Sequence, residues 1–328
     1  MAGNSEFDLS VIIVNWNTQE DLDNCLASCL SISDDLTKEL IVVDNGSADQ
    51  SVLLVKQKYP EVKLIENRYN IGFAAAVNQG LSLSKGTYLL VLNPDITIPR
   101  YTVSKLIDIF EIHPDAGAIA PRLINKDGSY QVGYFRKYPS MMQILLFYTS
   151  FSKFTSRNDK LFRKYMEDIP TAESDLISVP QIPGGCMMIR REILDDVGFM
   201  DEKFFLFFED VDWCYRIKKK GWTLLMVNSV FMNHLGGRSI LKQKNEWIYG
   251  RFLLSLNQFV DKHYKIRYQI VTKIITVGNS VFVLIVKSIL RYSGLFRNRS
   301  KLQESISSNR LFLKMFFEYY MKIIPPMK

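Results

Sequence analysis

The sequence is poor in cysteine, with four residues in a chain of 328, and none of them has the paired spacing that binds zinc. Cys25 and Cys29 lie one helical turn apart in an apolar pattern, so we interpret all four, Cys186 and Cys214 included, as buried thiols in a reducing cytoplasm. The polar start MAGNSEFD lacks a charged segment followed by an apolar one, which predicts that no signal peptide is present. Repeats and low-complexity segments are also missing, which favours a globular protein over a disordered one.

A long apolar run is missing too. The apolar stretch from Ile274 to Val286 has 13 residues between Lys273 and Lys287, fewer than the about 20 that a membrane-spanning helix needs. Residues 242–328 nevertheless contain 16 Lys and Arg against 4 Asp and Glu, a net charge of +12, which leaves −5 of the total of +7 for residues 1–241. We therefore predict a larger domain at 1–241 and a separate basic region at 242–328.

Nucleic acid and an anionic membrane are the usual partners of such a basic region. Apolar residues dominate its basic stretches and no nucleic-acid-binding motif occurs, so we expect no nucleic acid as partner. Helical patterns at 246–260, 274–286 and 311–324 favour amphipathic helices in an anionic membrane surface, on its cytoplasmic side. Packing of these helices on the first domain, or in a homodimer, is the alternative.

The first domain alternates apolar runs of strand length with helical patterns. We predict strands at 9–14, 40–43, 62–65 and 88–92, with helices at about 20–30, 50–58 and 73–83. This alternation predicts an α/β fold with a mostly parallel sheet that is flanked by helices and binds ligands at the carboxyl ends of its strands. The chain reads VNWNTQ after the first strand instead of GxGxxG, which argues against a dinucleotide-dependent oxidoreductase.

Polar residues collect where the predicted strands end. Asn15 follows the first strand and Asp44 the second, where a carboxylate can accept hydrogen bonds from a ribose hydroxyl or a base. Asn93 and Asp95 follow the fourth strand, and carboxylate oxygens suit the hard divalent cations that bind diphosphates. Ordinary turn chemistry is the alternative at both places.

The stretch GFMDEKFFLFFEDVDWCYR, from Gly198 to Arg216, places three acids after an apolar aromatic run. Asp210 points away from the helix face that Glu209 and Asp212 share, so it could face a cleft alone as a base with a pKa tuned by burial. Favourable interaction of the three acids with the helix dipole is the alternative.

Two further motifs remain. The run IPGGCMMIRR contains Gly184 and Gly185, which allow a backbone to approach a ligand, and Arg190 and Arg191, which could contact phosphate; a plain turn is the alternative. His234 lies in NHLGG and is a candidate metal ligand or a structural residue.

Taken in order over about 230 residues, VIIVNWN, VDNGSAD, ENRYNIGFAAAVNQG, LLVLNPD, PGGCMMIRR, GFMDEKFFLFFEDVDWCYR and NHLGG closely resemble family 2 glycosyltransferases of the GT-A fold. The likeness is strongest to the rhamnosyltransferase-like branch. It implies a Rossmann-like GT-A domain, to which the composition of residues 242–328 adds a helical, membrane-associating C-terminal extension. It also implies an inverting transferase that uses a nucleotide diphosphate sugar.

The resemblance also implies roles for individual residues. Asp210 would be the catalytic base, with Glu209 and Asp212 orienting the acceptor and the neighbouring backbone. The acceptor-side loop would contain Gly184, Gly185 and Cys186, and the metal, Mg²⁺ or Mn²⁺, would be bound by Asp95 and His234. The donor would be held or its pocket shaped by Asn15, Asp44, Asn70, Gly72, Asn78, Asn93 and Asp95.

The sequence departs from the family pattern at two positions. Asn93 stands where the DxD motif has its first acid, which predicts weaker metal binding. Glu246 stands where the QxxRW motif of polymerising relatives has arginine, which favours addition of one or a few sugars.

We expect transfer of rhamnose from dTDP-rhamnose to a lipid-linked saccharide, in the synthesis of a bacterial cell-surface polysaccharide. The alternatives are transfer of another hexose from a UDP-sugar and a catalytically silent nucleotide-sugar-binding scaffold. The acceptor, the linkage and the oligomeric state do not follow from the sequence.

Overall fold

A computed structural model of the protein describes residues 6–33, 35–131, 137–155, 160–161, 164, 174–236, 242–293 and 299–321. The chain divides into two compact units. The sheet unit comprises Met1–Arg136, Ile169–Phe205 and Glu209–Ser239, and the helical unit comprises Lys137–Asp168, Leu206–Phe208 and Ile240–Lys328. Gly237 of the NHLGG motif and residues 322–324 of the last predicted helix lie outside the described residues.

The sheet unit is built on one mixed sheet. Its strands are β1 (Phe7–Asn15), β2 (Lys38–Asp44), β3 (Lys63–Glu66), β4 (Gly86–Leu92), β5 (Ile96–Thr97), β6 (Ala116–Ile124), β7 (Leu176–Ser178), β8 (Cys186–Arg190) and β9 (Thr223–His234). Across the described residues the order is β3-β2-β1-β4-β8-β6-β9-β5, and β7 pairs with β9. The four strands predicted from the sequence, β1 to β4, are parallel neighbours as expected.

Strand β8 departs from the parallel arrangement, because it runs antiparallel to both β4 and β6. Its first residue, Cys186, pairs with Leu92, the last residue of β4. The turn that enters β8 therefore lies at the carboxyl ends of the parallel strands. This reversal brings the predicted acceptor-side glycines to the same edge as the strand-end polar residues.

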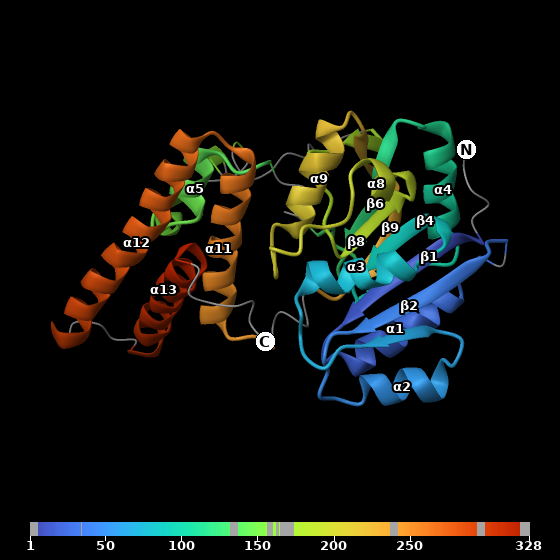
Figure 1. Ribbon diagram of the computed structural model, residues 1–328, viewed down its shortest axis with the longest axis horizontal. Helices are drawn as coiled ribbons and strands as arrows, with labels where there is room; N and C mark the ends of the chain where they lie inside the picture. Colours follow the sequence, from blue (N-terminus) through green and yellow to red (C-terminus); the bar gives the residue numbers. More distant parts are fainter. Residues whose placement is uncertain are drawn as a thin grey trace. The chain divides into compact units, whose positions relative to one another are not determined.

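Helices cover both faces of the sheet, as the alternating pattern predicted (Figure 1). One apolar core joins the sheet to α1 (Gln19–Leu30), α2 (Ser51–Lys58) and α4 (Thr102–Ile112). The other core joins it to α3 (Phe73–Leu83), α8 (Glu192–Asp196) and α9 (Glu209–Lys219). Both strand faces are buried, which explains why the strand sequences are continuously apolar rather than alternating.

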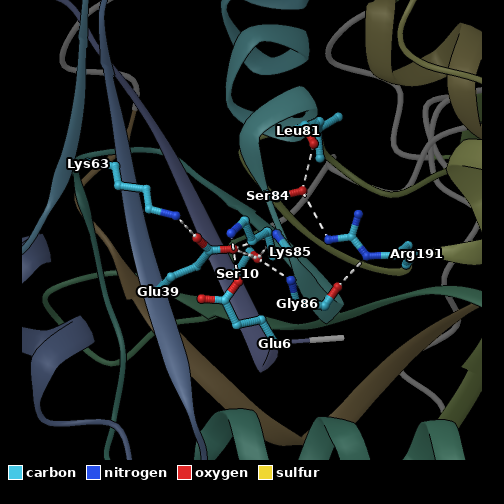
Figure 2. Close-up of polar contacts among 9 residues, drawn as sticks. All are labelled: Glu6, Ser10, Glu39, Lys63, Leu81, Ser84, Lys85, Gly86 and Arg191. Atoms are coloured by element: carbon cyan, nitrogen blue, oxygen red, sulfur yellow. Dashed lines mark hydrogen bonds and ion pairs between the residues drawn. The ribbon is translucent and has the colours of Figure 1, made fainter. Parts of the chain in front are cut away.

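A buried polar network holds the opposite, amino-terminal end of the sheet together (Figure 2). The Glu39 carboxylate accepts hydrogen bonds from the Ser10 hydroxyl at 2.6 Å, the Lys85 backbone N–H at 2.5 Å and the Lys63 ammonium at 2.6 Å. Burial acts to raise the pKa of Glu39, but these hydrogen bonds outweigh it and hold the pKa below its ordinary value. The network thus ties the starts of β1, β2, β3 and β4 to one carboxylate.

The helical unit contains α5 (Met141–Phe147), α6 (Ser152–Thr155), α11 (Asn245–His263), α12 (Ile266–Ser293) and α13 (Arg299–Tyr320). Helices α11 and α13 pack closely at Gly250, where a Cβ would lie 3.2 Å from the Met315 sulfur. Two residues that precede α9 also belong to this unit: Phe207 and Phe208 have positive φ angles of 66° and 67°, and their rings lie 5.7 and 5.4 Å from the Phe252 ring.

The helical unit corrects one prediction for the C-terminal region. The apolar stretch expected to be too short for a membrane belongs to a 28-residue helix, α12, and 266–291 is the one stretch of the described chain that is long and apolar enough to cross a membrane. In the segment predicted to lie in a membrane surface at 311–324, α13 packs on α11 and buries Phe312, Met315 and Phe316, while Phe317, Tyr319 and Met321 are exposed, so that prediction stays a prediction.

Candidate active site

The ends of β1 and β2 form the first part of the candidate site. Register pairs Asn15 with Asp44, and the Asn15 amide donates to Asp44 Oδ1 at 2.9 Å. The backbone N–H of Ser47 donates to Asp44 Oδ2 at 2.9 Å, while the Ser47 hydroxyl accepts from the Asn15 amide and from the Asn17 N–H. Asn15 and Asp44, which were predicted to bind the nucleotide-sugar donor, are both buried, so the protein holds their side chains rigidly in place.

The loop before α3 forms the next part. Asn70 Oδ1 accepts hydrogen bonds from the Asn45 amide at 3.0 Å and from the Gly72 N–H at 2.9 Å, so Asn70 shapes this loop. Gly72 has φ of 94°, and a Cβ there would lie 2.8 Å from the Phe205 carbonyl. Only glycine allows both the positive φ and this close approach. The loop can therefore pack directly on the segment that precedes α9.

The NPD motif lies beside the double-glycine turn. The Asn93 N–H donates to the Gly185 carbonyl at 2.8 Å. A Cβ at Gly185 would lie 2.3 Å from the Asn93 amide nitrogen, and a Cβ at Gly184 would lie 2.9 Å from Asp210 Cβ. The two glycines therefore allow one backbone turn to lie between the NPD motif and Asp210, which the sequence separates by more than 100 residues.

Asp95 and His234 come together through the pairing of β5 with β9. His234 Nε2 lies 3.3 Å from Asp95 Oδ1, and both side chains are almost fully buried. The opposite ring nitrogen, Nδ1, is 2.6 Å from Gln131 Oε1, and Gln131 Nε2 donates to the His234 carbonyl at 2.9 Å. Among the described residues no group of three or more His, Cys, Asp or Glu side chains could hold a metal, so this pair is an incomplete ligand set.

Asp210 lies at the start of α9 and is held by two backbone groups. Its Oδ2 accepts from the Gly184 N–H at 2.9 Å and its Oδ1 from the Val211 N–H at 2.8 Å. Burial raises the pKa of Asp210, and the two N–H groups oppose that rise because they stabilise the carboxylate. The result is a positioned carboxylate that is more basic than an exposed aspartate.

Glu209 is buried, whereas Asp210 is partly exposed, and Glu209 Oε2 has no hydrogen-bond partner among the described residues. Burial raises the pKa of Glu209 well above its ordinary value, and the charge of Asp210 raises it further. Adjacent residues of α9 thus form a pair in which Asp210 carries the negative charge more readily than Glu209 does.

Asp212 and Asn78 lie farther from this pair and position its surroundings. Asp212 accepts from Arg216 Nε at 2.8 Å, and the same guanidinium donates to the carbonyls of Val197 and Phe199. The Asn78 amide donates to the Met200 carbonyl at 2.9 Å and accepts from the Met200 N–H at 3.1 Å. These contacts anchor the loop that leads to α9.

The side chains of three other predicted residues are buried in the core or bonded at the opposite end of the sheet. Cys186 is fully buried, its sulfur lies 3.6 Å from that of Met232, and burial raises its pKa to about 12. Strand alternation turns the Cys186 side chain into the core, and its place in the acceptor-side loop stays a prediction. Arg190 donates to the Ala116 carbonyl and Arg191 to the Gly86 carbonyl, at the end of β8 opposite the glycine turn, so neither is placed as a phosphate ligand.

Gln131 is the residue that the sequence did not single out. It lies 103 positions from His234 and belongs to no motif, so only the folded chain brings the two side chains together. Asn45 was visible only as one of several polar residues after β2, although it bonds to Asn70, to the Gly72 carbonyl and to the Ile71 N–H.

The polar residues at the strand ends and the acids at the start of α9 define an α/β protein whose candidate site lies at the carboxyl edge of its sheet. Comparison with known proteins then identifies the family. The model of Glycosyl transferase family 2 matches residues 10–198, and that of Glycosyl transferase family group 2 matches residues 133–319. The chain belongs to glycosyl transferase family 2, as its motifs predicted, and is a glycosyltransferase.

Two curated relatives illustrate the match. N-acetylglucosaminyl-diphospho-decaprenol L-rhamnosyltransferase of Mycobacterium tuberculosis is 29% identical over 237 residues, which cover 69% of this chain and 75% of the relative. Low-salt glycan biosynthesis hexosyltransferase Agl10 of Haloferax volcanii is 26% identical over 219 residues, which cover 65% and 62%. The first of these supports the predicted likeness to the rhamnosyltransferase-like branch.

Solved structures agree on the fold. GalNAc-T7, solved with UDP, GalNAc and Mn²⁺, has a TM-score of 0.56 and 16% identity, and the match covers 96% of this chain but only 57% of that chain. The mannosyltransferase PcManGT of Pyrobaculum calidifontis, solved with GDP-Man and Mn²⁺, has a TM-score of 0.53 and 14% identity over 94% of this chain and 88% of that one. The predicted GT-A fold is thereby confirmed.

Proposed function

We propose that this glycosyltransferase inverts the anomeric centre of its donor and transfers rhamnose from dTDP-rhamnose to a lipid-linked saccharide. The observation that carries the proposal is the position of Asp210. Its carboxylate is fixed by the Gly184 N–H, and the same glycine turn contacts Asn93 of the NPD motif. A base and a diphosphate-binding motif on either side of one turn suit a direct displacement.

Asp210 acts as the base in this displacement. Its carboxylate takes the proton of an acceptor hydroxyl while the hydroxyl oxygen forms a bond to the anomeric carbon. The bond from that carbon to the diphosphate breaks at the opposite side, the electron pair leaves with the diphosphate, and the configuration inverts. The pKa of Asp210, raised by burial, increases its proton affinity, and the N–H groups of Gly184 and Val211 keep its oxygens aimed.

The donor nucleotide is proposed to lie along the ends of β1 and β2. Asn15 and Asp44 are prearranged there by their mutual hydrogen bond and by Ser47. Asn70 and Gly72 shape the adjacent loop, so a nucleoside meets side chains that need little reordering.

Asp95 and His234 are proposed to hold a divalent cation, Mn²⁺ or Mg²⁺, which when bound neutralises charge that develops on the departing diphosphate. One carboxylate and one imidazole suit such an ion when the donor's diphosphate and water complete its coordination. Gln131 Oε1 accepts the Nδ1 proton and leaves the His234 Nε2 lone pair toward Asp95. Asn93, the first residue of the NPD motif, is neutral and adds no negative charge to this proposed metal site.

The acceptor is proposed to be a lipid-linked saccharide at the cytoplasmic face of the cell membrane. The Mycobacterium tuberculosis relative is named for a diphospho-decaprenol substrate, and residues 242–328 carry the basic charge that suits an anionic surface. We also propose that the catalytic domain ends at residue 241. We further propose that the enzyme adds one or a few sugars to each acceptor.

Donor binding and turnover test the proposal. Thermal-shift binding and donor hydrolysis are measured with dTDP-rhamnose, UDP-glucose, UDP-galactose and UDP-N-acetylglucosamine, each with Mn²⁺, Mg²⁺ or EDTA. We expect dTDP-rhamnose with a metal to stabilise the protein most and to turn over. Preference for a UDP-sugar would replace rhamnose by another hexose, and binding without transfer to any lipid-linked acceptor would favour a silent scaffold.

The metal site is tested by direct binding. Asp95→Ala and His234→Ala should each lose the metal-dependent part of the thermal shift and weaken Mn²⁺ binding in titration calorimetry, while the wild-type shift with donor and EDTA is retained. Unchanged Mn²⁺ affinity in both variants would place the metal elsewhere.

A further inference from the structure

The polarity of helix α12 is inverted relative to that of a helix in a water-soluble bundle. Its buried face carries hydroxyl groups: Thr272, Thr276 and Ser280, at intervals of four residues, are at most 1% exposed. The Asn257 amide of α11 donates to Thr276 Oγ1 at 3.2 Å, and the side chain of Asn279 accepts from the Ser150 N–H at 2.9 Å. The polar side of α12 therefore faces the other helices of its own unit.

The opposite side of α12 is apolar and exposed. Six large side chains on it are between 51% and 67% exposed, namely Ile266, Ile270, Ile274, Phe282, Ile285 and Ile289. We call these six residues the outer stripe. Only 22% of the most apolar window of the helix is buried, so α12 differs from the core helix of a soluble protein.

We propose that the outer stripe docks on an anionic lipid bilayer, with α12 lying along the membrane surface. Charge identifies lipid as the occupant, since α12 contains no acidic residue and exposes Arg267 and Arg291 near its two ends. The charge of Lys273 could oppose burial of α12 in the membrane. However, its ammonium is paired with Asp261 at 2.9 Å and lies over the Tyr320 ring. An apolar stripe between cations is the pattern of an interfacial helix.

An orientation along the surface follows from the neighbour of α12. The helix is about 42 Å long at 1.5 Å per residue, enough to cross the hydrocarbon core. However, α13 packs against it and exposes Lys301, Arg310 and Lys314. If α12 spanned the membrane, it would carry these charges into the hydrocarbon at a high cost in free energy. If α12 lies along the surface, only its outer stripe contacts the hydrocarbon.

The purpose of this docking, which is to bring the enzyme to a lipid-linked acceptor, rests on the proposed function. Docking itself depends on side chains outside the candidate active site. Donor hydrolysis without lipid therefore separates failure of docking from failure of the proposed activity.

The test uses the full chain and vesicles of phosphatidylcholine, with and without phosphatidylglycerol, at low salt. We expect wild type to float with the anionic vesicles and Phe282→Glu/Ile285→Glu to bind them at least about tenfold more weakly, because two apolar side chains leave the membrane. The control Leu53→Glu/Ile112→Glu introduces the same charge at exposed apolar residues of the sheet unit and should bind nearly as wild type. All variants should keep wild-type donor hydrolysis.

A fluorescent label reports the orientation. The four native cysteines are buried, so a thiol-reactive dye can be directed to Ile285→Cys, with Leu53→Cys as the control. We expect only the label at 285 to shift to the blue with vesicles, and to be quenched most by nitroxide lipids of shallow depth. Strongest quenching at the bilayer centre would overturn the surface orientation.

A second copy of the chain is the competing occupant of the outer stripe. Light scattering that shows a wild-type dimer, made monomeric by Phe282→Glu/Ile285→Glu, together with unchanged vesicle binding, would overturn the proposal. A wild-type protein that fails to float with anionic vesicles would do so as well.

Discussion

At the scale of single residues, the site depends on how strongly burial acts on two adjacent acids. Asp210 has two backbone donors that favour its charged form, whereas Glu209 has an oxygen without a partner among the described residues. Loss of water around the two acids raises both pKa values, but the backbone donors keep Asp210 able to serve as a charged base, whereas Glu209 favours its neutral form.

Replacement of the base should affect transfer rather than binding. We expect Asp210→Asn to lower transfer by about 10²- to 10⁴-fold, since the amide cannot accept the acceptor proton. The thermal shift by donor should remain, because Asn preserves the size and hydrogen-bonding shape of the side chain. Asp127→Asn, in an exposed hairpin turn, is the control. An active Asp210→Asn enzyme would exclude Asp210 as the base.

Glu209→Gln should change stability in a way that depends on pH. Because burial and the charge of Asp210 raise its pKa, the folded state prefers protonated Glu209. The stabilisation from Glu209 is therefore full below the ordinary glutamate pKa and is lost as pH rises through the raised pKa. Denaturant unfolding should show Glu209→Gln as more stable than wild type in alkaline buffer and equal to it in acid. Equal stability throughout would contradict the raised pKa.

At the scale of elements, the turn before β8 and the network at the strand starts have separate tasks. The turn lets the NPD motif and the start of α9 approach each other, at positions where any Cβ would clash. The Glu39 network joins four strands at the opposite end of the sheet and involves none of the proposed site residues.

Gly184→Ala should impair catalysis because it displaces the base Asp210 or the glycine turn that holds it. The added Cβ would lie 2.9 Å from Asp210 Cβ, so the turn or the base must move, and a shift of this size can cost about 10²-fold in rate. Gly278→Ala makes the same substitution where, outside its own helix backbone, a Cβ would meet no atom of the described residues within 4 Å, and transfer should be unchanged. Full activity of Gly184→Ala in steady-state assays would show that the turn tolerates movement.

Glu39→Gln should destabilise the sheet unit by about 1–3 kcal/mol at neutral pH, since buried donors lose a charged acceptor. The pKa of Glu39 is lowered on folding, so its stabilisation is present above the ordinary glutamate pKa and disappears as pH falls through the folded pKa. Urea unfolding across pH should show the difference from wild type shrinking in acid. Glu66→Gln breaks only the exposed pair with Lys56 and should cost under about 1 kcal/mol.

At the scale of the whole molecule, charge is divided along the chain. The net charge of +12 in residues 242–328 contrasts with −5 in the remainder, so electrostatic attraction to an anionic surface concentrates in one region. The helical unit adds the apolar outer stripe to that charge.

Salt should therefore weaken membrane binding more than catalysis. We expect affinity for phosphatidylglycerol vesicles to fall on the order of tenfold or more between low and high salt, because counterions screen surface charges. Donor hydrolysis, measured in parallel without lipid, should change much less. Salt-independent flotation would mean that the apolar stripe acts without the basic charge.

The sequence by itself determined the family and the first half of the fold. Continuous apolar strands that alternate with amphipathic helices permit only a covered parallel sheet, and its strand ends must carry Asn15, Asp44 and Asp95 at one edge. Local patterns also predicted α9 and its acids, since a helix separates Asp210 from the face of Glu209 and Asp212.

Only the tertiary structure decided which residues meet and which face each side chain takes. Strand alternation in β8 turns Cys186 into the core. The β5–β9 pairing brings Asp95 to His234 and the turn after β6 brings Gln131 there, although no local pattern records either contact. The inverted polarity of α12 was equally invisible, because hydropathy measures how apolar a helix is but not which side its neighbours cover.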